Sequence, residues 1–404
     1  MSFRSIIALL LTLPLLLNGC QFMGPEPEPD AADRDKPQFD ESYYQDNARS
    51  YFQGKQYARA QQQWNTVLKH FRPDDWLAKL GVASCDYFMA STRLDRGDIT
   101  GAQTQFQVAE KGVREIWNGT IEKDTTLGLE VNQRQWQAAL MLALVHRGLG
   151  DVEHIEILRL SQQILALPPN SRDGQSLTSK MEERKRRKDA NYSQALMLLD
   201  RLVAMENFSP DALVNRAELR QRLGDSNGSE ADFNKWLSIA QASLDGHYAN
   251  RKVIEEAPGS ENNRKELLAL WDEKIASVRL KQIEVLLRLG NMQFDKGTER
   301  DREYKLLQGA DDSAAALARS AALRHWSRAL QYLENAKIVD PDRMEVLVKL
   351  AQIEGELGNY ESALHNINSY ISKANLRAST DWEKDLAQAF AMKAEYERRL
   401  DQKR

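Results

Sequence analysis

The sequence predicts an all-α protein, and three observations support that prediction. The composition is rich in Ala, Leu, Gln, Glu, Lys and Arg, which favour helices, and only 11 of the 404 residues are proline. Apolar residues recur every three or four positions over long stretches, which is the spacing of one helix face. Near the C-terminus two such stretches match each other at an offset of 34 residues. We therefore expect paired helices stacked in a repeating array.

The first 19 residues have the organisation of a secretory signal. Arg4 precedes an apolar run over residues 6–17. This run is too short to span a bilayer, which takes about 20 residues. The run ends in Leu17-Asn18-Gly19-Cys20, which resembles the lipobox of bacterial lipoprotein signal peptides, with Asn18 as a departure from the usual small residue. The resemblance implies cleavage before Cys20 and acylation of its thiol and new amine. The alternative is an ordinary signal peptide with an incidental cysteine.

Residues 20–40 are expected to form a tether behind the acylated cysteine. They lack apolar periodicity and alternate proline with acid, as in PEPEPD. Such a segment is typically extended, and about 20 residues at about 3.1 Å each would reach about 60 Å. Gln21, directly after Cys20, favours sorting to the outer membrane.

The clearest repeat lies in residues 313–375, where two units match well. Asp340-Pro341 ends one helix and Gly358 ends the next. Small residues are expected where two helices touch, and large residues are expected to fill the gaps between successive helices. The pairs 34 residues apart are Trp326 with Tyr360, Ala329 with Ala363, Leu333 with Ile367, and Ala336 with Tyr370. This pattern resembles the tetratricopeptide repeat, a 34-residue helix-turn-helix unit, and implies an α-solenoid.

Weaker copies extend the resemblance over residues 41–240, giving five or six units in all. Polar stretches at 172–189, 244–263 and 295–312 are expected to interrupt the array. Residues 241–312 are thus expected to hold an irregular insertion and one long helix ending at Gly290, and residues 376–404 a capping helix. The second-helix residues of the weaker copies are Tyr57, Ala60, Trp64 and Val67; Ile99, Ala102, Phe106 and Ala109; Tyr192, Ala195, Leu199 and Leu202; and Ala231 and Phe233.

The sequence contains no motif of catalysis or metal binding. The six histidines form no HExxH motif, and no GxSxG, GxGxxG or Walker-type element is present. The net charge of −4 gives no electrostatic reason to expect nucleic acid. Cys85 is expected to be a small core residue. We therefore expect no enzyme, no cofactor and no metal.

Two further features have competing explanations. The basic run at residues 184–188 could meet an acidic partner or lipid head groups, but the adjacent acids at residues 182, 183 and 189 favour a solvated helix end.

The eight tryptophans could form a glycan-binding platform. Most of them lie at packing positions, which leaves Trp76 and Trp117 as candidates for exposure.

The resemblance implies that protein partners bind along the surface formed by the first helices of the units. In the last unit the inward positions would be Glu345, Val348, Gln352 and Glu356, which do not supply the Lys and Asn of the clamp that some family members use for a C-terminal carboxylate. We expect a non-enzymatic scaffold, anchored by its acyl chains to the periplasmic face of the bacterial outer membrane, that recruits or stabilises proteins of an envelope assembly. The alternative is a glycan-binding or polysaccharide-export accessory lipoprotein that uses exposed aromatics.

Overall fold

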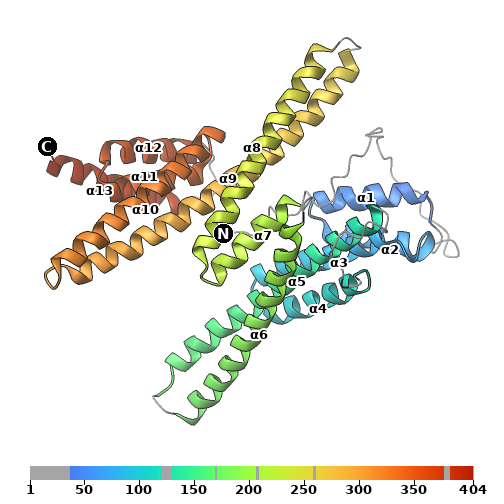
Figure 1. Cartoon of the computed structure of the whole chain (residues 1–404), viewed down its shortest axis with the longest axis horizontal. Coiled ribbons are helices and arrows are strands. Elements are labelled where there is room, and N and C mark those ends of the chain that lie inside the picture. Colours follow the sequence, from blue (N-terminus) through green and yellow to red (C-terminus); the bar gives the residue numbers. More distant parts are fainter. Residues whose placement is uncertain are drawn as a thin grey trace. The chain divides into compact units, whose positions relative to one another are not determined.

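The computed structural model describes residues 37–117, 119, 129–168, 171–205, 209–257, 261–376 and 383–403. All regular structure in these ranges is helical, which confirms the all-α prediction. The predicted signal peptide, Cys20 and most of the predicted tether lie outside the described residues. The helices, shown in Figure 1, are α1 (Glu41–Gln53), α2 (Tyr57–His70), α3 (Trp76–Asp95), α4 (Ile99–Arg114), α5 (Leu129–Leu165), α6 (Arg172–Ala204), α7 (Pro210–Arg222), α8 (Ser226–Glu256), α9 (Glu261–Leu307), α10 (Asp312–Val339), α11 (Met344–Leu357), α12 (Tyr360–Leu376) and α13 (Glu383–Lys403).

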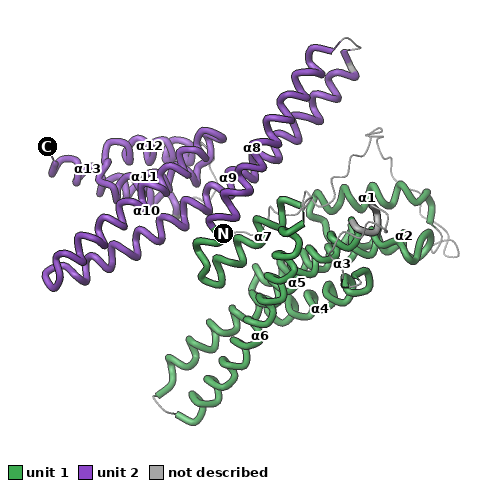
Figure 2. The backbone as a smooth tube through the Cα atoms, in the orientation of Figure 1, with its two compact units in different colours: residues 1–229 green, residues 230–404 purple. Residues whose placement is uncertain are grey.

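The chain divides into two compact units, Met1–Ser229 and Glu230–Arg404, coloured separately in Figure 2. The division falls inside the first turns of α8, before the predicted end of the N-terminal array at residue 240. The physical reason is that α8 from Glu230 onward packs along α9: Gln293 donates a hydrogen bond to Glu230 at 2.7 Å, and Lys281 lies over the Trp236 ring.

Unit 1 consists of helix hairpins in which neighbouring first helices also touch. Each helix from α1 to α6 packs against the next, and in addition α3 contacts α5 and α5 contacts α7. Asp75 and Asp98 cap the starts of α3 and α4 by accepting hydrogen bonds from backbone N–H groups of Leu77, Ala78 and Gly101. Gly97 supplies the positive φ of 82° that the turn between these two helices requires. The first helices α3, α5 and α7 thus form one continuous layer.

The predicted packing positions of the second helices α2, α4, α6, α10 and α12 are confirmed. Alanine is fully buried where two helices of a hairpin touch, and the residue four positions later fills the gap to the following helix. The alanines, each 0% exposed, are Ala60, Ala102, Ala195, Ala329 and Ala363. The large residues, each at most 1% exposed, are Trp64, Phe106, Leu199, Leu333 and Ile367.

One predicted position in α8 is wrong. Ala231 is exposed, whereas Ser229 is 0% exposed and lies four residues before the equally buried Phe233. Ser229 therefore occupies the position of the alanines in the other second helices. The register is set by Asp225, whose carboxylate accepts a hydrogen bond from the Gly228 N–H at 2.9 Å and so fixes where α8 begins.

The polar stretches expected to interrupt the array are largely helical. Residues 172–189 belong to α6, residues 244–256 continue α8, and residues 295–307 continue α9, so residues 241–312 hold the long hairpin α8–α9 rather than an irregular insertion. Charged side chains occur in these stretches because they cover solvated helix faces, with ion pairs one turn apart such as Arg187 with Glu183.

Gly290 does not end the long helix, contrary to the prediction. α9 runs on to Leu307, and a side chain at Gly290 would lie 2.8 Å from Leu333 of α10. Gly297 makes the same kind of approach to Trp326, at 2.5 Å from an added Cβ. These glycines let α9 and α10 approach closely, which is a role in helix packing and not in chain termination.

The last three helices form a single core at the end of unit 2. Gly358 ends α11 with a left-handed φ of 78°, as the sequence predicts. Residues Glu383–Lys403 form α13, whose Tyr396 packs against Gly355 of α11 and joins the core of α11 and α12. Lys403 Nζ donates a hydrogen bond to the Gly358 carbonyl oxygen at 2.7 Å, so α13 covers the end of the last hairpin.

Candidate partner-binding groove

The predicted binding residues of the last unit do not form one open surface. Glu345 and Glu356 are exposed on α11, but Val348 packs against the core that α11 shares with α12 and α13. Gln352 is half-buried, and its Oε1 is buried with no hydrogen-bond donor among the described residues. Val348 shares this core with Ala389 and Tyr396 of α13, so the four residues differ in exposure, and their role in binding stays a prediction.

A hollow lined by both polar and aromatic side chains lies in unit 1. It is a groove of ≈ 820 Å³ lined by the second half of α3, by α5 around Gly148 and by the turn from α1 into α2, with Arg222 at the end of α7. The groove therefore follows the layer of first helices, where the tetratricopeptide resemblance implies that partners bind.

Aromatic rings form the floor of this groove. Tyr57 of α2 and Phe88 of α3 are stacked, with ring centroids 4.9 Å apart and ring planes at 15°. Tyr87 lies 5.2 Å from Phe88 and 5.6 Å from Phe106, and both Tyr87 and Phe106 are buried, so they support the stacked rings without adding exposed surface. Stacked and edge-on rings offer a rigid apolar surface at low entropic cost, which suits the anchoring of a partner side chain.

Exposed cations form the rim. Lys55, Arg59, Arg93 and Arg96 are all exposed and line the groove, and Asp95 is the one exposed acid among its lining residues. Arg59 donates a hydrogen bond to Gln56 at 2.9 Å, and Arg93 lies 3.9 Å from Asp98 with both side chains half exposed. Surface pairs of this kind contribute at most about 1 kcal/mol, so they leave the rim cations able to bind an anion.

A buried ionic network fixes the groove from beneath. Arg147 of α5 donates hydrogen bonds to Asn215 Oδ1 and Glu218 Oε2 of α7, each at 2.8 Å, and to the Tyr87 hydroxyl at 3.4 Å. The side chains of Arg147 and Glu218 are each 5% exposed. Because buried charges are stable only when paired and hydrogen-bonded, this network ties the layer of α3, α5 and α7 into one arrangement.

Asp151 makes a second ionic junction one turn further along α5. Its Oδ1 accepts a hydrogen bond from the Tyr192 hydroxyl at 2.7 Å and lies 2.9 Å from Arg222 Nε. Burial, together with the adjacent Asp151 charge, raises the pKa of Tyr192, and burial lowers the pKa of Arg222. Tyr192 therefore stays a neutral donor, and α5, α6 and α7 are joined at this point.

The sequence contains one indication of this network, namely charged residues within an apolar run, which the helical periodicity does not explain. Arg147 and Asp151 interrupt an otherwise apolar and glycine-containing stretch of α5, where every residue from Ala138 to Gly150 is buried. His146 in the same stretch is buried, and burial lowers its pKa. A charge inside a buried run predicts a buried partner, but its identity requires the tertiary fold.

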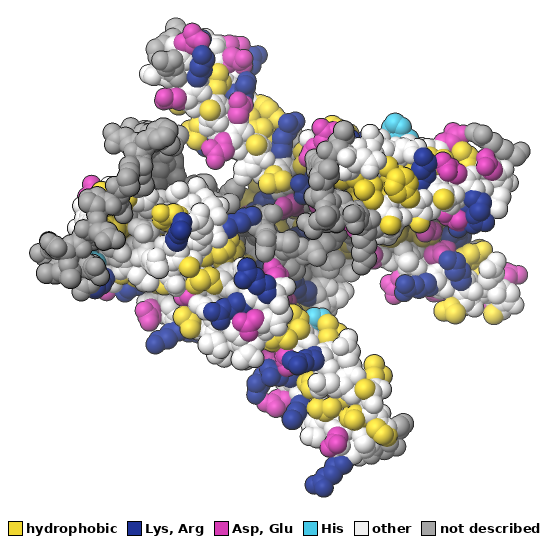
Figure 3. Space-filling view, turned by 180° about the vertical axis from the view of Figure 1, so that it is seen from behind, with side chains coloured by type: hydrophobic (Ala, Val, Ile, Leu, Met, Phe, Trp, Pro, Cys, Tyr) yellow, Lys and Arg dark blue, Asp and Glu magenta, His cyan; other side chains and the backbone are white. Residues whose placement is uncertain are grey.

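Other polar surfaces of the described residues are less suited to a site. The basic run does not form a helix end, contrary to the prediction, because α6 extends from Arg172 to Ala204. Arg184 pairs with the buried Glu153 of α5 at 2.9 Å and Lys185 with Glu182 at 2.6 Å, so part of the run is already paired. On the face seen in Figure 3, basic and acidic side chains are interspersed without a large area of one sign.

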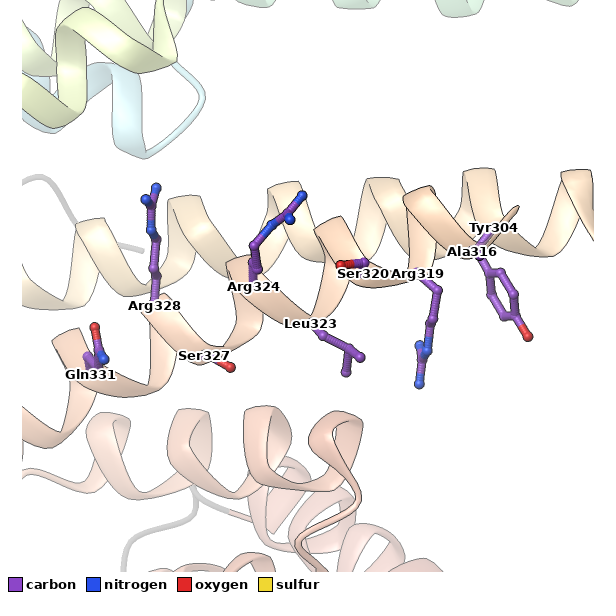
Figure 4. Close-up of a pocket in the computed structure, with 9 residues that line it drawn as sticks. All are labelled: Tyr304, Ala316, Arg319, Ser320, Leu323, Arg324, Ser327, Arg328 and Gln331. Carbon is purple, nitrogen blue, oxygen red and sulfur yellow. The ribbon is translucent and has the colours of Figure 1, made fainter. Parts of the chain in front are cut away.

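A shallow hollow on α10 does not gather its side chains around one point. Figure 4 shows Arg324 and Arg328 projecting to one side of the helix, and Arg319 and Leu323 to the other. Among the residues that the structure describes, no group of three His, Cys, Asp or Glu side chains could hold a metal ion. None of the described helices is long and apolar enough to span a membrane.

The tryptophans within the described part of the chain do not form the platform that the glycan alternative requires. Of the seven that the structure describes, none is exposed. Trp76 and Trp117, the candidates for exposure, are both half-buried, and the Trp117 Nε1 is itself buried. Most of their surface contributes to packing, as expected of large aromatic side chains.

Comparisons with known proteins add similarity of fold only. No protein-family model and no curated protein matches the chain. Among solved structures, a TPR repeats protein from Bacteroides fragilis matches at 13% identity and a TM-score of 0.23, covering 78% of this chain and 99% of its own. The TPR2AB domain of yeast Sti1 matches at 10% identity and a TM-score of 0.22, covering 88% and 98%. Similarity at this level gives no information about a ligand, and the fold class follows from the helices and buried positions of the chain itself.

Proposed function

We propose that this chain is a non-enzymatic interaction protein that binds a partner protein in the groove of unit 1. The observation that carries the proposal is the aromatic floor held in place by the buried Arg147–Glu218 network. A preorganised apolar surface with a polar rim is the usual anatomy of a protein-binding site, because little entropy is lost on binding.

We further propose that the chain acts at the periplasmic face of the bacterial outer membrane, where acyl chains on Cys20 anchor it. Support comes from the lipobox-like Leu17-Asn18-Gly19-Cys20 and from the Pro/Glu tether that follows. The partner is then a protein of an envelope assembly. Replacing Cys20 with Ser should move the protein from the membrane fraction to the soluble fraction without changing its helix content. Retention of the variant in the membrane fraction would contradict the anchor.

Site-specific photo-crosslinking in cells tests the groove. A photoreactive residue at Ala58, which is exposed and lines the groove, should give a consistent set of crosslinked proteins. The same residue at Ala190, exposed on α6 and outside the groove, is the matched control and should give none of them. No crosslinked protein specific to Ala58 would contradict the proposed function.

The glycan alternative makes a different prediction. Replacing Trp76 and Trp117 with Ala would abolish glycan binding while leaving protein capture at Ala58 intact. Their half-buried position favours a loss of stability instead, which a thermal melt of the two variants would measure.

A further inference from the structure

We infer that the partner segment bound by the groove is acidic and carries an apolar or aromatic anchor, and that its recognition needs no free C-terminal carboxylate. The inference rests on the proposed function and names the chemistry of its ligand. It follows from charges and rings that unit 1 brings together at one end of its first helices.

The charge of the rim is the first step of the argument. Four exposed cations line the groove. Lys55 precedes α2 and Arg59 lies in its first turn, whereas Arg93 lies in the last turn of α3 and Arg96 follows that helix. The exposed acids beside them are Asp95 and Asp98. The rim therefore has a net positive charge although the whole chain has a net charge of −4. A local positive field on an acidic protein favours an acidic partner and disfavours a basic one.

The base of the groove limits how the acidic segment can be held. Arg147 and Arg222 also line the groove, but each already has a carboxylate at close range, Glu218 at 2.8 Å and Asp151 at 2.9 Å. A carboxylate of the partner would have to displace Glu218 from a buried pair or Asp151 from a partly exposed one, and breaking the buried pair is costly. The rim cations are thus the residues that meet the partner's acids.

The floor determines the anchor. The stacked rings of Tyr57 and Phe88 line the same groove as the rim cations and are partly exposed, while Met89 and Leu94 extend the apolar lining. A purely acidic segment would leave this surface uncovered, whereas a segment with an aromatic or branched apolar side chain between its acids would bury it. The charges then increase the rate of association, and the apolar anchor slows dissociation of the bound segment.

The probe for the test is a fluorescein-labelled peptide of glutamates around two phenylalanines, acetylated and amidated at its ends. We expect it to bind the unlipidated chain (Cys20→Ser, without the signal peptide) in a fluorescence anisotropy titration. Replacing its glutamates with lysines should abolish binding, and replacing its phenylalanines with serines should weaken binding about tenfold or more. Raising the ionic strength from about 0.01 M to about 0.15 M, which shortens the Debye length from about 30 Å to about 8 Å, should weaken it as well.

Charge reversal in the protein gives the matched comparison. The double variant Arg93→Glu/Arg96→Glu should weaken binding about tenfold or more. The control Arg159→Glu/Arg186→Glu makes the same change of charge at exposed helix positions of unit 1 outside the groove and should change binding less than about twofold. All four positions are exposed, so both variants should keep the helix content of the parent, measured by far-UV circular dichroism.

Several results would overturn the inference. Equal binding of the lysine peptide, equal loss in the control variant, or binding only of a peptide with a free C-terminal carboxylate would each do so. If the peptide binds only after Glu26, Glu28 and Asp30 of the tether are neutralised, the groove is occupied by the chain's own tether. If the protein self-associates and the Arg93→Glu/Arg96→Glu variant does not, the groove is occupied by a second copy of the chain. Crosslinking of a neutral or basic partner segment at Ala58 would contradict the inference but not the proposed function. The absence of any crosslink at Ala58 would contradict the proposed function itself.

Discussion

Replacing Arg147 with Met is the most direct test of the network that fixes the groove. The substitution keeps most of the side-chain volume but removes the partner of the Glu218 carboxylate at 2.8 Å and the hydrogen bonds to Asn215 and Tyr87. Both charged side chains are 5% exposed, so water cannot replace the lost partner. Removing one member of such a buried pair typically costs about 3–5 kcal/mol. For a domain of this size the expected fall in Tm is about 6–20 °C.

The loss should be confined to unit 1, and hydrogen–deuterium exchange read by mass spectrometry can locate it. Peptides from α3, α5 and α7 should exchange faster in the variant, while peptides from α11 and α12 of unit 2 should be unchanged. Urea unfolding followed by far-UV circular dichroism gives the free energy. The control Arg159→Met removes a surface pair with Glu156 at 3.8 Å, in which Arg159 is 65% exposed, and should cost at most about 1 kcal/mol.

The double variant Arg147→Met/Glu218→Leu decides whether the cost arises from a stranded charge. Replacing both partners with apolar side chains should restore stability to within about 1 kcal/mol of the parent protein. A single variant that costs less than about 1 kcal/mol, or a double variant no more stable than the single, would refute the assignment of Arg147 and Glu218 as a coupled buried pair.

Four further substitutions test the packing of α8, α9 and α10. Gly297→Ala should destabilise unit 2 by about 1–3 kcal/mol because the new Cβ would lie 2.5 Å from Trp326; Gly246→Ala, at a helix position with no heavy atom within 4 Å, should instead stabilise by about 0.5–1 kcal/mol in the same urea titration. Lys281→Met should stabilise unit 2 at pH 7 by about 2–3 kcal/mol, because burial lowers the pKa of Lys281 from 10.5 to about 8. Between pH 8 and pH 10.5 the unfolded parent chain binds more protons than the folded one, so the stability of the parent rises with pH. The stability advantage of the variant should therefore vanish by about pH 10.5. An advantage that does not depend on pH would contradict the prediction. Ser229→Ala should be neutral or stabilising by about 1 kcal/mol, because the buried Ser229 hydroxyl has no hydrogen-bond partner among the described residues, and a clear loss in the thermal melt would mean that it has one.

The register of the helices could be predicted wherever a local pattern carries it. The small and large residues of the second helices, such as Ala329 and Leu333, have a fixed spacing, and each is buried as predicted. The prediction failed in α8, where a serine replaces the alanine and the residue at the expected place, Ala231, is exposed. Composition could not distinguish a polar loop from a solvated helix in residues 172–189, because both are rich in charge.

The sequence by itself determined the fold class, the repeat and most of the second-helix positions that pack within the hairpins, since these depend on the spacing of side chains along one helix. It could not determine what Gly290 does, because a glycine that ends a helix and one that admits Leu333 of another helix look alike in a single sequence. Only the tertiary structure decided where the groove lies. Arg147 and Glu218 are 71 residues apart and the stacked rings of Tyr57 and Phe88 belong to different hairpins, so the site exists only once α3, α5 and α7 lie in one layer.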